Sequence, residues 1–159
     1  MENLKLTRID NRLIHGQVGV TWTNHLGANL VVVANDAVAN DKVQQSLMDM
    51  VLPDTVQSRY FTLDKTIEVI QKASPKQKIF LVVRNLEDLL KLVEGGIPVD
   101  KVNVGNLHYE EGKEQVTSTV SINDQDRKIL RKLKDFNVEM EIRGVPGEKS
   151  ANMYEVSKI

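Results

Sequence analysis

Two unbroken apolar runs constrain the fold of this chain more than any other feature. Asn29–Ala34 contains a Leu-Val-Val-Val run, and Lys78–Val83 is apolar from its second residue onward. Strands without polar alternation are typical of parallel strands that are covered on both faces. The sequence therefore predicts an α/β fold, with an open, mainly parallel, twisted sheet and helices on both faces.

The remaining elements alternate as such a fold requires. Further strands are predicted at Leu4–Ile9, Val56–Thr62, Lys101–Val104 and Val138–Arg143. Helices are predicted over Gln17–Leu26 with a Gly27 cap, after Asn35-Asp36 through about Val51, over Asp64–Lys72, after an Asn85 cap, and from an Asn123 cap through Phe136. Gln115–Ile122 alternates as edge strands do, and the edge of the sheet is where an antiparallel strand is expected.

The second helix has a clear apolar pattern. Val43, Leu47, Met50 and Val51 follow one another at i, i+4, i+7 and i+8, which predicts the apolar face of an amphipathic helix. Pro53 ends the helix, because proline lacks an N–H donor and restricts the residue before it.

Length and composition narrow the class of protein. The 159 residues fit one domain over 1–159, with a tail from about Gly144 that contains two chain breakers and one short helix. The chain has no cysteine, which excludes disulfides and thiolate chemistry. A net charge of −1 and 4% aromatic residues argue against nucleic-acid binding. No apolar run approaches the roughly 20 residues of a membrane span, and no signal peptide is visible, so a cytoplasmic protein is expected.

The first strand-to-helix turn concentrates the residues that can do chemistry. Within Arg8–Val18 the chain collects Asp10, Arg12, His15 and Gly16. Ligands of open α/β sheets bind beyond the carboxyl ends of the strands, and helix N-termini favour anions. The turn is therefore the first candidate for a functional site, and an anion is the expected ligand.

His15 is the candidate nucleophile of this turn. A neutral imidazole has one free nitrogen that can attack phosphorus without a metal, while Asp10 could orient the other nitrogen. Arg12 can act as a phosphate fork, and the amides of Gly16 and Gln17 open a helix whose dipole favours an anion. The alternative interpretation is that His15 only caps the helix.

Other polar residues give weaker signals. Arg84 follows the fourth strand and could supply a second positive charge to a phosphate, or pair with Glu87 or Asp88. His108 fits a surface loop better than the same crevice, and His25 reads as a helix-end histidine. No metal-binding spacing, dinucleotide fingerprint, P-loop or nucleophile elbow is present in the sequence, so neither a metal nor a cofactor is predicted.

The string Arg-Ile-Asp-x-Arg-Leu-x-His-Gly-Gln-Val at Arg8–Val18 resembles the IIB components of the mannose/sorbose family of the sugar phosphotransferase system (PTS). The likeness extends over nearly the whole chain. Further agreeing segments are Val33–Asp41, Met48–Pro53 and Val102–Asn106.

The resemblance implies a phosphoryl carrier. His15 would take a phosphoryl group on Nδ1 from a phosphohistidine of a IIA partner, and would pass it to a sugar that enters through the membrane subunits IIC and IID. Arg12 would contact that phosphoryl group, and the first strand would lie near the middle of the sheet. The protein would associate peripherally with the membrane subunits, and Leu13 and Ile14 would form part of an exposed apolar docking rim.

The substrate implied is a hexose or amino-hexose, because Val20–Asn24 and Gln44–Met50 resemble the N-acetylgalactosamine/galactosamine branch. The alternative function is a non-catalytic or regulatory module that binds a partner on the same fold. A receiver domain is disfavoured, because the third strand ends in Phe61-Thr62-Leu63 and lacks an acceptor aspartate.

Overall fold

A seven-stranded sheet forms the centre of the protein. The computed structural model describes residues 1–159, except the side chains of Gln17 and Val18. The strands are β1 (Leu4–Asp10), β2 (Leu30–Ala34), β3 (Gln57–Phe61), β4 (Ile79–Val83), β5 (Lys101–Asn106), β8 (Glu139–Ile142) and β9 (Ala151–Asn152). Their order is β3-β2-β4-β1-β5-β8-β9, and only the β8–β9 pair is antiparallel. The predicted α/β fold with β1 in the middle is confirmed, as is an antiparallel strand at the edge.

The register of β1 decides which residues meet at the carboxyl edge of the sheet. Ile9 is paired with Val83 of β4 on one side and with Val104 of β5 on the other. From β1 the chain continues to β2, which lies on one side of β1 in the sheet, whereas from β5 it continues to β8 on the other side. The direction in which strands are added therefore reverses between β1 and β5. Such a reversal opens the crevice in which α/β proteins bind ligands.

Most helices begin and end close to the predicted residues, but the second begins at Lys42 and not directly after Asp36, because the chain first forms a 3-10 turn at Val38–Asn40. The helices are α1 (Gly16–Leu26), α2 (Lys42–Asp49), α3 (Leu63–Val69), α4 (Leu86–Glu94), α5 (Asp124–Asp135) and α6 (Met153–Val156), with short 3-10 turns at Val38–Asn40 and Ile70–Lys72. Asn85 and Asn123 accept bonds from backbone amides as caps, and Gly27 ends α1 in the left-handed conformation at φ 63°.

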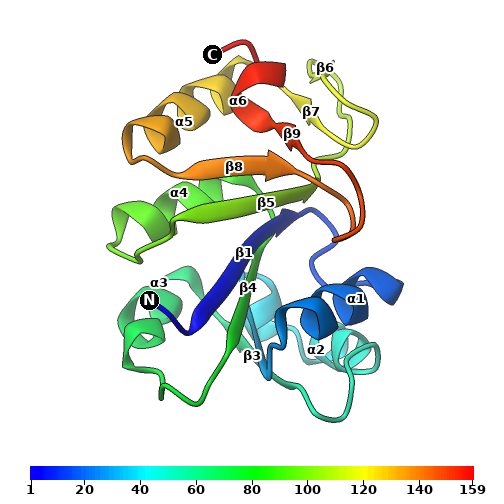
Figure 1. Ribbon diagram of the computed structural model, residues 1–159, viewed down its shortest axis with the longest axis vertical. Helices are drawn as coiled ribbons and strands as arrows, with labels where there is room; N and C mark the ends of the chain where they lie inside the picture. The colour runs from blue at the N-terminus through cyan, green and yellow to red at the C-terminus, as the bar shows by residue number, and fades with distance from the viewer.

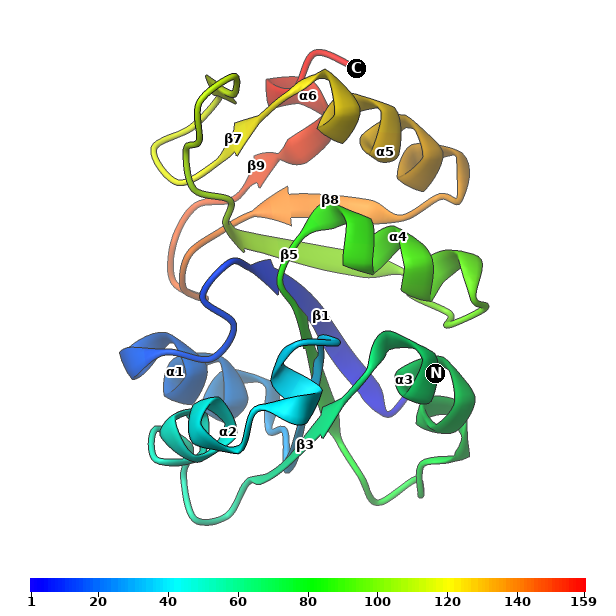
Figure 2. The ribbon, with the colours of Figure 1, turned by 180° about the vertical axis from the view of Figure 1, so that it is seen from behind.

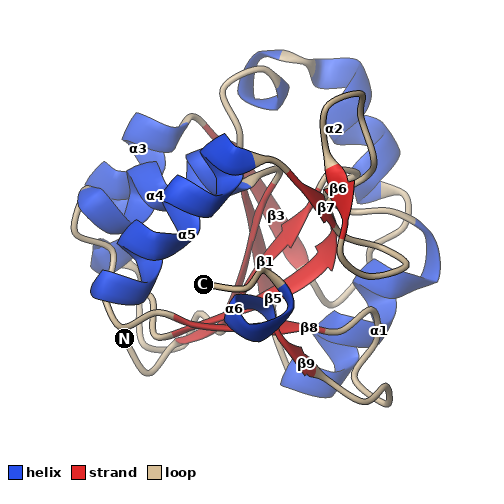
Figure 3. Cartoon of the chain, turned by 90° about the horizontal axis from the view of Figure 1, so that it is seen from above, coloured by secondary structure: helices blue, strands red, loops and turns tan.

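Helices cover the sheet on both faces (Figures 1 and 2). Figure 3, seen from above, shows α3, α4 and α5 together on one side of the strands and α1 on the other. The larger core cluster lies under α3, α4, α5 and α6, and a smaller one contains Trp22 of α1 and Met48 of α2. Side chains of β1 point alternately to the two faces of the sheet, so Ile9 belongs to the larger cluster and Leu6 to the smaller one.

The predicted apolar face of the second helix is wrong. Val43, Leu47 and Met50 are exposed, and the only buried side chain of α2 is Met48; of the four predicted residues only Val51, just beyond α2, packs partly buried against the smaller cluster. Periodicity identifies the apolar stripe of a helix but does not say which face meets the sheet. Here the opposite face is held inward, because Gln45 donates a side-chain hydrogen bond to the carbonyl of Val38 at 2.8 Å and Met48 packs in the core.

This arrangement predicts opposite results for two adjacent residues. Met48→Ala should lower the free energy of unfolding by about 2–5 kcal/mol, because it leaves a cavity in the core. Leu47→Ala should change it by less than about 0.5 kcal/mol, because the residue is 60% exposed. Urea unfolding of both variants measures the difference, and a larger loss from Leu47→Ala would contradict the orientation of α2.

The predicted edge strand Gln115–Ile122 is also wrong. The segment contributes to two short antiparallel strands, β6 (Glu114–Gln115) and β7 (Ser121–Ile122), which form a sheet of their own. The chain reverses between them, where Val116 donates to the carbonyl of Val120 at 2.9 Å. The antiparallel edge strand is instead β9 in the tail, and the short helix expected there is α6.

Candidate functional site

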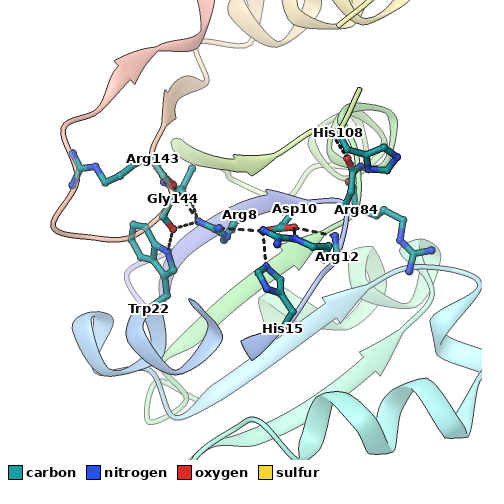
Figure 4. Close-up of polar contacts among 11 residues, drawn as sticks. Arg8, Asp10, Arg12, His15, Trp22, Arg84, His108, Arg143 and Gly144 are labelled. Atoms are coloured by element: carbon teal, nitrogen blue, oxygen red, sulfur yellow. Dashed lines mark hydrogen bonds and ion pairs between the residues drawn. The ribbon is translucent and has the colours of Figure 1, made fainter. Parts of the chain in front are cut away.

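The turn between β1 and α1 is organised around one buried carboxylate. Asp10 is fully buried and accepts from three residues of its own segment (Figure 4). Its Oδ1 accepts the Arg12 amide N–H at 2.9 Å and lies 3.5 Å from Arg12 Nε. Its Oδ2 lies 3.1 Å from Arg8 Nη2 and 3.2 Å from His15 Nε2. A buried charge needs such partners, because an unpaired carboxylate in this position would be costly.

His15 occupies the N-cap position of α1 but is directed toward Asp10. Its backbone is extended, and its ring makes no capping hydrogen bond among the described residues. The ring is 23% exposed, and the nitrogen next to Asp10 is Nε2. A carboxylate accepts from Nε2–H, so this contact favours the tautomer whose lone pair is on Nδ1. The imidazole thus has Nε2 held by Asp10, and no described residue contacts Nδ1 in a hydrogen bond.

Buried apolar side chains hold the turn in shape. Leu13 has a positive φ of 59°, which a leucine rarely adopts, and its amide donates to the carbonyl of Asp10 at 2.9 Å. Leu13 and Ile14 are both buried in the cluster beneath α1. The prediction that they form an exposed rim is therefore wrong: their burial anchors the turn, which the strained backbone of Leu13 requires.

The region near His15 carries positive charge. The Arg12 side chain is 55% exposed, so its guanidinium remains accessible beside the ring. Gly16 begins α1 at φ 45° with open space where a side chain would lie, and the first turn of α1 has no acidic residue. The dipole of the helix therefore meets no neutralising carboxylate in that turn, which favours an anion there. The prediction for Gln17 lies outside the described residues.

Arg84 and His108 lie at the same edge of the sheet but are not brought to His15. Figure 4 shows both side chains directed away from the imidazole. His108 Nε2 lies 3.2 Å from Glu110 Oε1, and both side chains are more than half exposed. His25 is in the last turn of α1, where its ring lies edge-on to Trp22 with the centroids 6.0 Å apart. His15 is thus the one histidine of the three that contacts Asp10.

Asn11 ties the turn to two neighbouring loops, a role that its residue type did not reveal. Its Nδ2 donates to the carbonyl of Arg84 at 2.9 Å, and its Oδ1 accepts the amide N–H of His108. Its own amide donates to the carbonyl of Asn106 at 3.0 Å. The ends of β1, β4 and β5 are therefore fixed to one another beside His15.

Arg8 is a second residue of this site whose role the sequence did not reveal. It is only 2% exposed, and burial lowers the pKa of its guanidinium, against the opposing effect of Asp10. The signal in the sequence was its spacing: Arg8 and Asp10 are two apart on a strand, so they share one face of the sheet.

An acidic pair lies farther along the same edge. Asp88 of α4 accepts from Asn35 Nδ2 at a long 3.5 Å. Burial, together with the charge of Asp36, raises the pKa of Asp88 above its ordinary value.

Within the described residues, no group of three metal-binding side chains is found, and no helix is long and apolar enough to cross a membrane.

Comparison with known proteins identifies the family. The model of the PTS system sorbose subfamily IIB component matches residues 4–159. The chain belongs to this family. Its members are phosphoryl-transfer components of the PTS.

Relatives of known specificity are similar over almost their full length. Two N-acetylgalactosamine-specific phosphotransferase enzyme IIB components of Escherichia coli (strain K12) resemble the chain. Component 1 is 54% identical over 92% of this chain and 94% of its own. Component 2 is 49% identical over 98% and 99%. The crystal structure of an N-acetylgalactosamine IIB component from Streptococcus pyogenes superposes with a TM-score of 0.91 at 41% identity, covering 96% of each chain.

Proposed function

We propose that this IIB component carries the phosphoryl group on Nδ1 of His15, which accepts it from a phosphohistidine of the IIA protein. The observation that supports this assignment is the contact between His15 Nε2 and Asp10, because it leaves the lone pair on Nδ1. The phosphoryl group then passes to a sugar hydroxyl as the sugar enters through the membrane subunits IIC and IID. This role places the protein in the cytoplasm, at the membrane subunits.

The arrangement supplies what transfer between two imidazoles requires. Nδ1 of His15 forms a bond to phosphorus as the nitrogen–phosphorus bond of the donor breaks, and the electron pair remains on the donor ring. Positive charge develops on the His15 imidazole, which lies next to the Asp10 carboxylate. The phosphoryl oxygens would face Arg12 and the N-terminus of α1. Catalysis then consists of positioning and charge stabilisation, with no metal needed.

The test is phosphorylation of the chain by its own pathway. The protein is incubated with phosphoenolpyruvate, the general phosphotransferase proteins and a cognate IIA, and its mass is then measured. We expect the gain of one phosphoryl group, mapped to His15, that is labile in acid and stable in base. No gain in mass would contradict the proposal and favour a partner-binding module, whereas a label on another residue would contradict the assignment to His15.

The sugar we propose is N-acetylgalactosamine. The support is the near full-length similarity to three components that bear this specificity in their names. Membranes that contain the cognate IIC and IID subunits should discharge the phosphorylated protein faster with N-acetylgalactosamine than with mannose or sorbose. Equal or faster discharge by mannose or sorbose would reassign the substrate.

Arg12→Ala should slow phosphoryl transfer without unfolding the protein. Each charge-assisted hydrogen bond that is lost costs about 1.5–3 kcal/mol, which is roughly ten- to a hundredfold in rate. Because the side chain is 55% exposed, the free energy of unfolding should change little. Rapid-quench transfer from phosphorylated IIA measures the rate. Arg131→Ala, an exposed arginine on α5, is the control, and an equal loss there would contradict a local role for Arg12.

A further inference from the structure

Arg8 joins the acceptor site to two distant parts of the chain. Its Nη1 donates to the side-chain oxygen of Asn103 in β5, and to the carbonyls of Arg143 at 3.3 Å and Gly144 at 3.1 Å in the segment after β8. Its Nη2 donates to Asp10 Oδ2 at 3.1 Å. One guanidinium therefore holds the carboxylate from the side opposite the solvent.

The space around this guanidinium is closed. The Trp22 ring lies 5.6 Å from its central carbon, and the Trp22 indole N–H donates to the same carbonyl of Gly144 at 2.9 Å. Gly105 lies against its remaining side: an added Cβ would fall 2.0 Å from Arg8 Nη2 and 2.2 Å from Cζ. A side chain at position 105 would displace the guanidinium, so the glycine is required for Arg8 to lie where it does.

We propose that Arg8 is a positioning residue for phosphoryl transfer that acts through Asp10; this inference rests on the function proposed above. Arg8 Nη2 and His15 Nε2 approach the same oxygen of Asp10, at 3.1 and 3.2 Å. The guanidinium pairs with the buried carboxylate and fixes its orientation, so that this oxygen accepts the Nε2–H of His15. The ring is thereby held with Nδ1 toward the donor. Arg8 itself touches no phosphoryl group, because it is buried behind Asp10.

The chemistry of the step shows why the fixed anion matters. When Nδ1 takes the phosphoryl group, the donor nitrogen keeps the electron pair of the broken bond, and Nε2 of His15 keeps its proton. The acceptor ring therefore gains positive charge without a proton transfer, and Asp10 must remain negative beside it. Without the Arg8 guanidinium, the buried Asp10 carboxylate would lose an ion-pair partner and would be free to rotate away, and the ring would lose its acceptor.

Two variants remove the effect of Arg8 in different ways. Arg8→Met deletes the charge at similar length, whereas Gly105→Ala keeps every charge and displaces the guanidinium. Gly147→Ala is the matched control, since nothing lies within 4 Å of an added Cβ there and its backbone does not need a glycine. Circular dichroism establishes which variants fold.

Two measurements separate positioning from a merely structural role. Transfer from phosphorylated IIA is followed at increasing donor concentration, which resolves kcat from KM. NMR of protein with 15N-labelled histidine, in alkaline buffer where imidazole is neutral, then detects the Nε2–H of His15 when Asp10 protects it from exchange with water.

We expect Arg8→Met and Gly105→Ala to lower kcat about 10- to 100-fold, the range found when a group that orients a metal-bound imidazole is removed. KM should not change, and the protected Nε2–H signal should be lost, while Gly147→Ala matches the wild type. A folded variant with wild-type kcat, or a lowered kcat with an unchanged Nε2–H signal, would overturn the inference. If Arg8→Met does not fold, Gly105→Ala decides. A wild-type protein that accepts no phosphoryl group would instead contradict the proposed function.

Discussion

His15→Ala is expected to abolish phosphoryl acceptance while leaving the fold intact. The imidazole is the proposed nucleophile, and alanine offers no nitrogen to form the bond to phosphorus. The ring is partly exposed and makes no capping bond, so its loss should change the free energy of unfolding by less than about 1 kcal/mol. Transfer of a radiolabel from phosphorylated IIA measures acceptance, and thermal unfolding measures the fold.

The other two histidines provide matched controls for this experiment. His25→Ala and His108→Ala remove the same side chain from the end of α1 and from the loop after β5. Both variants should take up the radiolabel to the same extent as the wild type. Undiminished labelling of His15→Ala, or its loss in either control, would contradict the assignment of the acceptor.

Asp10→Asn is expected to impair both transfer and stability. The substitution keeps the size of the side chain but removes the charge that faces the His15 ring, and it replaces one acceptor oxygen with a donor. We expect transfer to slow about a hundredfold or more. It also leaves Arg8 buried without its counter-ion, and breaking a buried ion pair on one side costs about 3–5 kcal/mol. Urea unfolding and rapid-quench transfer test the two effects separately.

Asp126→Asn is the control for Asp10→Asn. It shows whether the effects on transfer and stability are specific to Asp10 or follow from the loss of any well-buried carboxylate. Asp126 accepts the backbone N–H of Asn123 in the capping box of α5, away from the β1–α1 turn. Its replacement should lower the free energy of unfolding by about 0.5–2 kcal/mol and leave phosphoryl transfer unchanged. If Asp10→Asn were no slower in transfer than Asp126→Asn, Asp10 would not act on the reacting imidazole.

Much of the fold was predictable because its signals are local. Continuous apolar runs marked β2 and β4, and the caps Asn85 and Asn123 marked the starts of α4 and α5. The sequence also indicated that Asp10, five residues before His15, could orient the ring, but only the structure shows the contact between them. These features depend on neighbours in the sequence, whose geometry the chain itself restricts.

Errors arose where burial was decided by remote segments. The apolar stripe of α2 was identified correctly as a stripe, but the helix packs through Met48 and leaves Leu47 in solvent. Leu13 and Ile14 looked like an exposed rim because they lie in a turn, yet they pack on the strands beneath α1. Period and residue type specify which side chains lie together, but not which of them meets the sheet.

The sequence by itself determined the α/β alternation, the position of β1 before a helix N-terminus, and the cluster of Asp10, Arg12 and His15. Only the tertiary structure decided that Arg8 lies behind Asp10, because its partners Asn103 and Gly144 are 95 and 136 residues away along the chain. The physical reason is that a buried guanidinium is stable only where several acceptors converge, and such convergence arises when the ends of β1, β5 and β8 are brought to one edge of the sheet.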